Sequence, residues 1–326
     1  MKVLVTGAAG FIGRVVGDRL RSDGDDVMPY DRAIEPADDI TDLTRVRAAA
    51  DGCDAVVHLA AKVGLGVGIA DIDDYARQND LGTAVVLRAT AEAGIRRLVF
   101  ASSMVVYGEG AYVCREHGPV RPPARETDDL ARGDFEVHCP LCGDDLVPEL
   151  IGEDAPLDPR NAYAATKVHG EHLAATWARE TGGVAAALRF HNVYGPGLPR
   201  NTPYAGVAAL FASRLADGEP ATVFEDGRQR RDFVHVDDVA RAVAAALRAA
   251  LAPGLTALNI GSGRVTTIGE VATALTAAVG GAPPVVTGDF RLGDVRHVTA
   301  DSAAARRVLG WSAEIELRDG VRDLIR

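Results

Sequence analysis

The most constraining feature of the 326-residue chain is a glycine pattern near its N-terminus, Gly7-x-x-Gly10-x-x-Gly13. The apolar run Val3-Leu4-Val5 precedes it and an amphipathic stretch, residues 11–21, follows it, which predicts a strand, a tight loop and a helix. Glycines permit the turn and let the backbone approach a phosphate group at the helix N-terminus. The same spacing also occurs in plain strand–helix turns, so this interpretation needs support from elsewhere in the chain.

A carboxylate after the next apolar run gives that support. Residues 26–30 predict a second strand, and Asp31 follows it, eighteen residues after Gly13. In a dinucleotide site a carboxylate here accepts hydrogen bonds from the ribose hydroxyls and repels a 2′-phosphate. The neighbouring Arg32 suits a 2′-phosphate instead. The pair therefore favours NAD as the cofactor and leaves NADP open.

Strands and helices alternate through the first 190 residues. Further strands are predicted at residues 39–40, 55–59, 98–101 and 185–190, and helices at 41–51, 73–94 and 161–181. This alternation favours parallel strands in a doubly wound, Rossmann-type α/β sheet. We expect an NAD-binding domain at 1–190 and a smaller, mainly substrate-binding C-terminal lobe at 191–326, with about 231–260 returning to the first domain.

The charge balance excludes some partners. A net charge of −11 with 47% hydrophobic residues is typical of a globular protein and argues against binding to nucleic acid or to a membrane surface. The first apolar run is too short for a secretory signal. Arg241 and Arg248 interrupt the alanine-rich stretch 239–252, so it does not form a membrane span. We expect a cytoplasmic protein.

A tyrosine and a lysine carry the candidate chemistry. Tyr163 and Lys167 stand four residues apart, on one face of the predicted helix. A free phenol has a pKa near ~10, and a nearby ammonium with a positively charged nicotinamide stabilises the phenolate; we expect a lowering of ~3 pKa units. The alternative is an exposed helical pair without a function.

Together with the glycine loop and Ser102-Ser103, this pair resembles the extended short-chain dehydrogenase/reductase family, in its nucleotide-sugar epimerase branch. The resemblance runs from the first loop to Asp294, except for residues 111–150. It implies Tyr163 as the base, with Lys167 beside it also binding the nicotinamide ribose. It implies Ser103 as the hydroxyl that binds the substrate oxygen, because Val106-Tyr107-Gly108 follows at the family's spacing; Ser102 is the less favoured candidate. Further cofactor-site residues that it implies are Phe11, Ile12, Asp39, Ile40, Leu59, Ala60, Ala61 and Asn79.

The residues after Ser103 separate the reactions of this family. Its sugar dehydratases have Asp-Glu there, whereas this chain has Met104-Val105, and neither side chain transfers a proton. The resemblance thus implies epimerisation at C4 of a nucleotide-diphosphate sugar through a 4-keto intermediate, of the UDP-hexose or dTDP-rhamnose type. A nucleotide-sugar oxidoreductase, a decarboxylase and a non-catalytic NAD-binding partner protein remain as alternatives. The resemblance also implies a homodimer through the helices at 73–94 and 161–181.

The substrate site is expected in the second half of the chain. By resemblance, Asn192 and Arg231 contact the diphosphate of the sugar nucleotide, and Arg291 with Asp294 makes a second phosphate and ribose contact. Guanidinium groups suit this role because they bind phosphate in a bidentate manner. Surface ion pairs are the alternative for both arginines. The loop that begins at Lys62 is expected near the sugar, or else as a plain connector.

A polar segment, residues 111–150, interrupts the pattern and is interpreted as an insertion. It contains Cys114-x-x-His117 and Cys139-x-x-Cys142, which together give a Cys₃His set suited to tetrahedral zinc. His138 is a competing fourth ligand, and unrelated free thiols are the alternative. Because the insertion is short of apolar residues for a core of its own, we expect zinc to have a structural role there.

Overall fold

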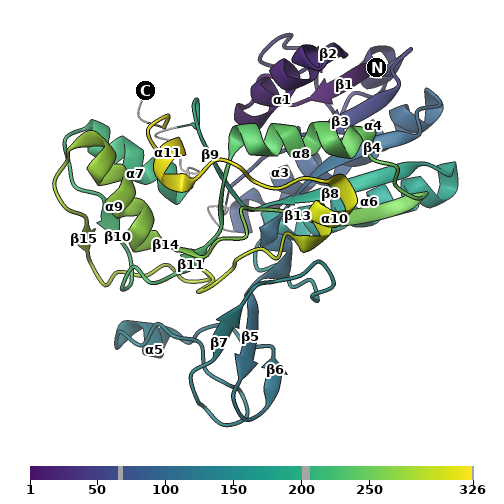
Figure 1. Ribbon diagram of the computed structural model, residues 1–326. Coiled ribbons are helices and arrows are strands. Elements are labelled where there is room, and N and C mark those ends of the chain that lie inside the picture. The colour runs from purple at the N-terminus through teal and green to yellow at the C-terminus, as the bar shows by residue number, and fades with distance from the viewer. Residues whose placement is uncertain (65–68, 200–205, 325–326) are drawn as a thin grey trace.

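The computed structural model describes residues 1–64, 69–199 and 206–324 (Figure 1). Within these residues a six-stranded parallel sheet has the order β13-β8-β4-β3-β1-β2. Its strands are β1 (Lys2–Thr6), β2 (Asp26–Tyr30), β3 (Ala55–His58), β4 (Arg97–Ser103), β8 (Val184–Phe190) and β13 (Gly254–Ile260). From β1 the chain first adds β2 on one side and then β3, β4, β8 and β13 on the other, so the direction of strand addition reverses at β1. Such a reversal is where doubly wound sheets bind ligands.

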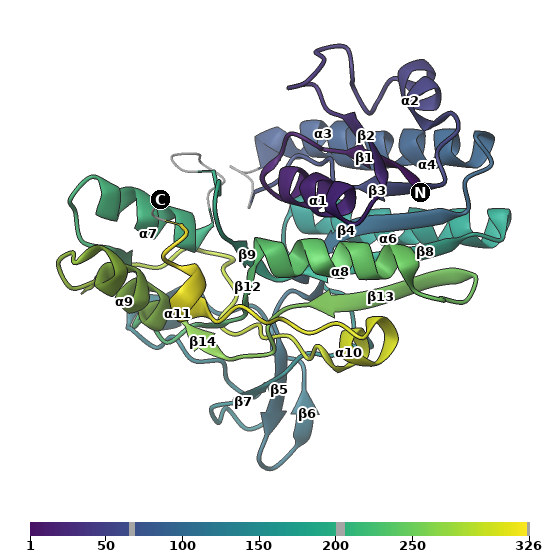
Figure 2. The same cartoon turned by 45° about the horizontal axis from the view of Figure 1, so that its top comes forward.

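Helices cover both faces of the sheet (Figure 2). On one face α1 (Phe11–Ser22) packs beside α8 (Val236–Arg248), and on the other lie α2 (Leu43–Ala50), α4 (Gly82–Glu92) and α6 (Ala162–Thr181). Each face has its own buried apolar core, which confirms the predicted α/β fold. No helix within the described ranges is long and apolar enough to cross a membrane.

Two predicted elements differ from the structure. Residues 39–40 do not form a strand: the Asp39 carboxylate accepts hydrogen bonds from the backbone N–H of Thr41 at 2.9 Å and from its hydroxyl at 2.8 Å. This local turn competes with a strand for the same backbone. The predicted helix 73–94 is divided into α3 (Ile72–Tyr75), a π-helical turn (Ala76–Leu81) and α4. π-helical turns are frequent at functional sites, and Asn79 lies in this one.

The second lobe has a separate core (Figure 1, left). It contains α7 (Val207–Ala216), α9 (Ile268–Val279) and α11 (Leu317–Gly320), with the strand pairs β9 (Asn192–Tyr194) and β12 (Phe233–His235), β10 (Thr222–Val223) and β15 (Val285–Val286), and β11 (Arg230–Arg231) and β14 (Thr266–Thr267). Between its segments the chain returns to the sheet as α8 and β13, and α10 (Ala303–Leu309) packs against both.

The insertion projects from the edge of the molecule, below the sheet in Figure 1. A three-stranded antiparallel sheet of order β6-β5-β7 builds it from β5 (Ala111–Cys114), β6 (Gly118–Val120) and β7 (Val147–Glu149), and α5 (Thr127–Ala131) lies beside it. The expectation that it has no core was wrong, because a small cluster is buried: Tyr112, Cys114, Val137, Cys139 and Leu146. Two of these five residues are cysteines, so the apolar core is small.

Candidate functional site

The glycine loop between β1 and α1 forms a backbone cradle. Gly7 has a φ of +71°, and its N–H donates to the carbonyl of Tyr30 at 3.0 Å. A Cβ atom added to Gly13 would lie 2.0 Å from the carbonyl oxygen of Gly7, and one added to Gly7 would lie 2.7 Å from the nitrogen of Ala60. Gly10 precedes α1 and has no side chain to cap it. The first N–H groups of α1 therefore face the loop, as a pyrophosphate site requires.

A cavity of about 910 Å³ extends from this cradle along the carboxyl ends of the central strands. Its lining contains thirteen of the fifteen residues expected at the cofactor: Gly7, Gly10, Phe11, Ile12, Gly13, Asp31, Arg32, Ile40, Leu59, Ala60, Ala61, Tyr163 and Lys167. Asp39 and Asn79 are not part of the lining. The size and the glycine cradle fit a dinucleotide.

Asp31 is fixed where β2 ends. Its carboxylate accepts hydrogen bonds from the N–H of Ala9 at 3.0 Å and from the N–H of Ala33 at 2.9 Å. Arg32 is exposed, and its guanidinium lies 3.5 Å from the carboxylate of Asp39. The fixed carboxylate of Asp31 favours ribose hydroxyls over a 2′-phosphate, and Arg32 is already paired with Asp39. Both features favour NAD over NADP.

Asn79 positions the cavity wall. Its amide oxygen accepts from the N–H of Lys62 at 2.8 Å, and its amide nitrogen donates to the Lys62 carbonyl at 3.0 Å and to the Thr166 hydroxyl at 2.9 Å. This buried side chain links the segment after β3 to α6. The loop that begins at Lys62 was expected near the sugar through its backbone groups, and its residues 65–68 lie outside the described residues. The Lys62 ammonium lies 2.6 Å from the Asp74 carboxylate.

Ser103, Tyr163 and Lys167 come together at the inner end of the cavity. Ser103 ends β4, while α6 begins after Asn161, whose side chain accepts from the N–H of Ala164 at 2.8 Å and presents Tyr163 in the first turn. Tyr163 and Ser103 line the same cavity. The Lys167 ammonium is buried, donates to the carbonyl of Ala101 at 2.7 Å and lies 5.7 Å from the centre of the Tyr163 ring.

The protein's own groups shift the pKa of Tyr163 upwards, whereas the expected lowering includes the charge of a bound nicotinamide. Burial raises the pKa of Tyr163 to about 12, although the hydrogen bond with Ser103 opposes the rise. Burial also lowers the pKa of Lys167 to about 8, with the charge of Glu171 opposing the change. The physical reason is that desolvation disfavours both charged forms, and the ammonium directs its hydrogen bond to a backbone carbonyl.

Ser102 has a different environment from Ser103. Its hydroxyl donates to Glu171 at 2.5 Å, and Arg189 forms two hydrogen bonds with the same carboxylate, at 2.9 and 2.8 Å. All three side chains are buried, which favours Ser103 as the residue that faces the substrate. The sequence analysis did not identify this ion pair. Its available signal was an arginine within the apolar strand that ends at Phe190.

A second cavity, of about 680 Å³, adjoins the first between the sheet and the second lobe. Tyr163 belongs to the lining of both cavities. The second one contains four of the expected substrate residues, namely Asn192, Arg231, Arg291 and Asp294. The structure therefore brings together residues that lie more than a hundred positions apart in the sequence, as a binding site for a second molecule requires.

Arg231 has the environment of an anion ligand. Its guanidinium donates to the carbonyls of Arg230 at 2.9 Å, Arg296 at 2.9 Å and Val295 at 2.6 Å. Burial lowers the pKa of Arg231, and within the described part of the chain no carboxylate pairs with it directly. A desolvated cation that is held by neutral carbonyls attracts a phosphate.

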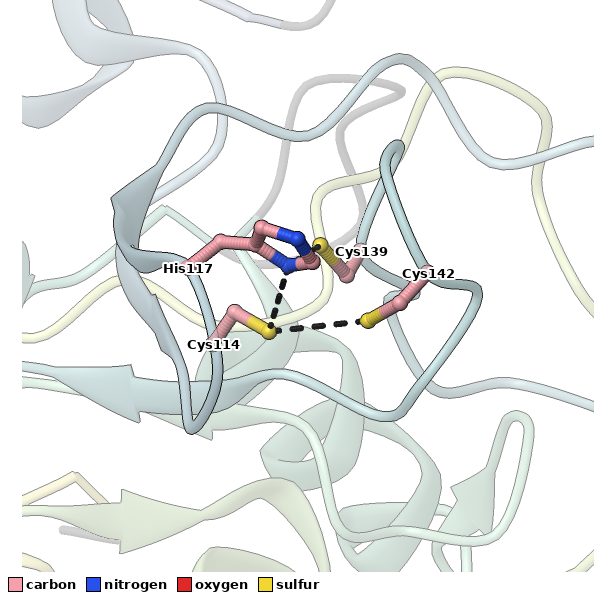
Figure 3. A group of neighbouring side chains, drawn as sticks. All are labelled: Cys114, His117, Cys139 and Cys142. Carbon is pink, nitrogen blue, oxygen red and sulfur yellow. Dashed lines mark hydrogen bonds between the residues drawn. The ribbon is translucent and has the colours of Figure 1, made fainter.

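The four predicted metal ligands form one cluster (Figure 3). Their ligand atoms all lie within 4.8 Å of one another, and the Cys114 sulfur lies 3.5 Å from the His117 Nδ1 and 3.7 Å from the Cys142 sulfur. Hydrogen bonds from backbone N–H groups, chiefly that of His117, lower the pKa of Cys114, which favours a thiolate ligand. His138 is not in the cluster, because its ring lies 3.1 Å from Asp134 and 3.0 Å from Asp145.

The fold, the glycine cradle and the Tyr163–Lys167 pair define a dinucleotide-dependent enzyme of the short-chain dehydrogenase/reductase type. The chain belongs to the NAD dependent epimerase/dehydratase family, whose sequence profile matches residues 3–127 and 142–261. The resemblance drawn from the motifs is thereby confirmed.

Characterised relatives cover the chain almost completely. The dTDP-L-rhamnose 4-epimerase of Burkholderia thailandensis is 33% identical over 99% of this chain and 93% of its own length. The UDP-glucose 4-epimerase of Mycolicibacterium smegmatis is 32% identical over 98% of this chain and 96% of its own. Among solved structures, MoeE5 in complex with UDP-glucose and NAD is 32% identical, with a TM-score of 0.79 over 100% of this chain and 97% of that one.

Proposed function

We propose that the protein epimerises a nucleotide-diphosphate hexose at C4 with bound NAD. One observation carries this proposal: Tyr163 lies where the cofactor cavity meets the substrate cavity, and Ser103 lines the cofactor cavity with it. A base that lines both cavities is placed to take a proton from a sugar hydroxyl beside a dinucleotide. The two arginines of the second cavity, Arg231 and Arg291, supply charge for a diphosphate.

The protein's own groups orient the sugar and move one proton. Ser103 binds the C4 oxygen. The phenolate form of Tyr163, which the positive charges of Lys167 and of a bound nicotinamide would favour against the effect of burial, takes the proton from that hydroxyl as the 4-keto intermediate forms. The glycine cradle and Asp31 would hold NAD, which would supply the hydride acceptor and donor for C4. Between the two transfers the keto sugar presents its opposite face, and Tyr163 then gives the proton back to the C4 oxygen. The configuration at C4 is inverted and no cofactor is consumed.

The two residues that follow Ser103 support epimerisation rather than dehydration of the sugar. Met104 and Val105 line the substrate cavity, and neither side chain exchanges a proton at C5 or C6. A dehydratase needs such an acid–base pair. An epimerase causes no net reduction of the cofactor, unlike an oxidoreductase or a decarboxylase. It also converts its substrate, unlike a non-catalytic NAD-binding partner protein.

The substrate is a UDP- or dTDP-hexose in this proposal. Relatives named as acting on UDP-glucose, UDP-glucuronate and dTDP-L-rhamnose support that range. The test is to incubate the purified protein with each sugar nucleotide and follow the C4 isomers by NMR without added reductant. Interconversion with no rise in absorbance at about 340 nm, the band of reduced nicotinamide, is expected. Stoichiometric reduction of the cofactor would show a one-way oxidoreductase instead.

We also propose that the cluster of Cys114, His117, Cys139 and Cys142 binds one structural zinc ion. The donor set and its compactness support this, because structural zinc sites take four Cys and His ligands in a tetrahedron. Metal analysis should find one zinc per chain, and Cys139→Ser should lose it. Metal-free protein with an ordered insertion and full activity would contradict the proposal.

The remaining proposals concern the state of the protein in the cell. We propose a cytoplasmic homodimer that associates through α4 and α6, which lie side by side on one outer face. Cysteines that bind a metal rather than pair in disulfides support a reducing compartment. Light scattering of the purified protein should give twice the mass of the 34.2 kDa chain, and charged substitutions on the outer faces of these helices should give that mass itself.

A further inference from the structure

One residue of the substrate cavity adopts a strained backbone conformation. Among the described residues, Glu225 is the only non-glycine residue with a positive φ, +52°. It is 3% exposed and contributes to the lining of the cavity. Non-glycine residues in this region carry a steric cost, and such strain persists where the surrounding contacts determine it. The contacts of the Glu225 side chain therefore show which interactions hold the backbone in this conformation.

The carboxylate of Glu225 joins the insertion to the second lobe. It accepts a hydrogen bond from Arg125 of the insertion at 2.9 Å and another from Arg296 at 2.8 Å. Arg296 has no exposed surface, and its other amino nitrogen donates at 2.6 Å to Glu136, also of the insertion. We call these four residues, Arg125, Glu136, Glu225 and Arg296, the charged clamp. Arg125 and Glu136 come from the insertion, Glu225 lines the cavity, and Arg296 directly follows the cavity residues Asp294 and Val295.

The segment held by this clamp also holds the candidate phosphate ligand. The carbonyls of Val295 and Arg296 are two of the three that accept hydrogen bonds from Arg231. Arg125 donates to the carbonyl of Asp294 at 2.7 Å. Both Val295 and Asp294 line the substrate cavity. A displacement of segment 294–296 would therefore move the guanidinium of Arg231 within that cavity.

The clamp is tied to the cysteine cluster through very short stretches of chain. Glu136 precedes the ligand Cys139 by three residues, and Tyr112 precedes the ligand Cys114 by two. The Tyr112 hydroxyl accepts from the N–H of His297 at 3.2 Å, while the His297 ring lies 3.1 Å from Glu136. A metal that fixes both cysteines consequently fixes the two insertion segments that contact residues 296–297.

We propose that metal occupancy of the cysteine cluster sets the affinity of the substrate cavity through the charged clamp. This inference rests on the proposed function and on the proposed zinc site, and it deepens both. The insertion is then a regulatory element of substrate binding, and loss of the metal weakens nucleotide-sugar binding without touching Ser103, Tyr163 or Lys167. A purely structural insertion would affect overall stability and leave the affinity per folded molecule unchanged.

The experiment compares metal-loaded and metal-free protein in a two-by-two design. Zinc is removed by a chelator from the full-length protein and from its Glu136→Gln variant, and KM, kcat and UDP or dTDP binding by calorimetry are measured. In the parent, metal removal should raise KM and the nucleotide Kd between about 5- and 150-fold, the usual range for coupled sites. The kcat at saturation and the bound NAD should be unchanged, and added zinc should restore the affinity.

The Glu136→Gln variant should show the weakened affinity already, and metal removal should then add little, because both changes act on one pathway. The matched control is Glu149→Gln, an exposed carboxylate in β7 of the same insertion, which should behave as the parent. An unchanged affinity after metal removal, or equal effects in parent and variant, would overturn the inference. Nucleotide binding without epimerisation would refute the proposed reaction and still test the coupling.

Discussion

The substitution Tyr163→Phe tests the proposed base with little change in structure. It removes the phenol oxygen and retains the ring, whose centre lies 6.2 Å from that of Tyr75. Loss of the hydrogen bonding of one hydroxyl costs about 1 kcal/mol of folding stability. Loss of a general base costs about 10²–10⁴-fold in kcat, which corresponds to about 2.7–5.5 kcal/mol of transition-state stabilisation. The effect on catalysis should thus exceed the effect on stability severalfold.

The measurement is the rate of C4 interconversion by NMR, together with the NAD content of the denatured protein and the melting temperature. Tyr75→Phe is the matched control, because it removes a phenol oxygen from the neighbouring ring, where that oxygen donates to the carbonyl of Gly64 at 3.2 Å. We expect this control to keep its activity and the Tyr163→Phe variant to keep its NAD. A Tyr163→Phe variant with the parental rate would refute the assignment of the base.

Three further predictions test the two cavities and the insertion. Gly13→Ala should yield protein without NAD, measured by absorbance after denaturation, because the new Cβ would lie 2.0 Å from the Gly7 carbonyl oxygen; retained NAD would contradict the cradle. Arg231→Met should raise KM about 10- to 150-fold with kcat unchanged, as expected for a lost charged hydrogen bond worth about 1.5–3 kcal/mol. Hydrogen bonding from His297 and Arg296 lowers the pKa of Glu136 to about 2 from 4.5, so its contribution to stability is complete above pH 4.5 and is lost as the pH falls towards 2. In an acid titration followed by circular dichroism, Glu136→Gln should show a weaker pH dependence in this window, and an identical curve would contradict the pairing.

Local spacing made the cofactor side of the site predictable. The glycine loop joins β1 to α1, Asp31 follows β2, and the Tyr163–Lys167 pair lies within α6, so a few neighbouring residues determine each local geometry. The strand predicted at 39–40 failed because Asp39 bonds to Thr41 in a local turn. The burial of Tyr163, which raises its pKa, was not predicted either. Burial depends on packing around α6 from several distant segments, and the sequence gives no measure of it.

Sequence analysis did not predict the charged clamp or the buried ion pair of Arg189 and Glu171, for a different reason. Arg296 and Glu136 are separated by 160 residues, and Glu225 lies in a turn with no recognisable motif. Charged residues are ordinarily assigned to the surface, and that assumption is usually correct. Arg296 has no exposed surface and Arg189 is 4% exposed, so burial converts these arginines from surface charges into structural elements.

The buried pair of Arg189 and Glu171 connects this structural role with the chemistry. Removal of one partner from a buried ion pair costs about 3–5 kcal/mol, because the other charge remains desolvated. Glu171 has a second effect, since its charge opposes the lowering of the Lys167 pKa by burial. The same carboxylate therefore stabilises the packing of α6 against β8 and helps keep the neighbouring ammonium protonated. The Ser102 hydroxyl donates to this carboxylate and so takes part in the same buried network. Ser103, which lines the cofactor cavity, is therefore the serine of this pair that can contact the substrate.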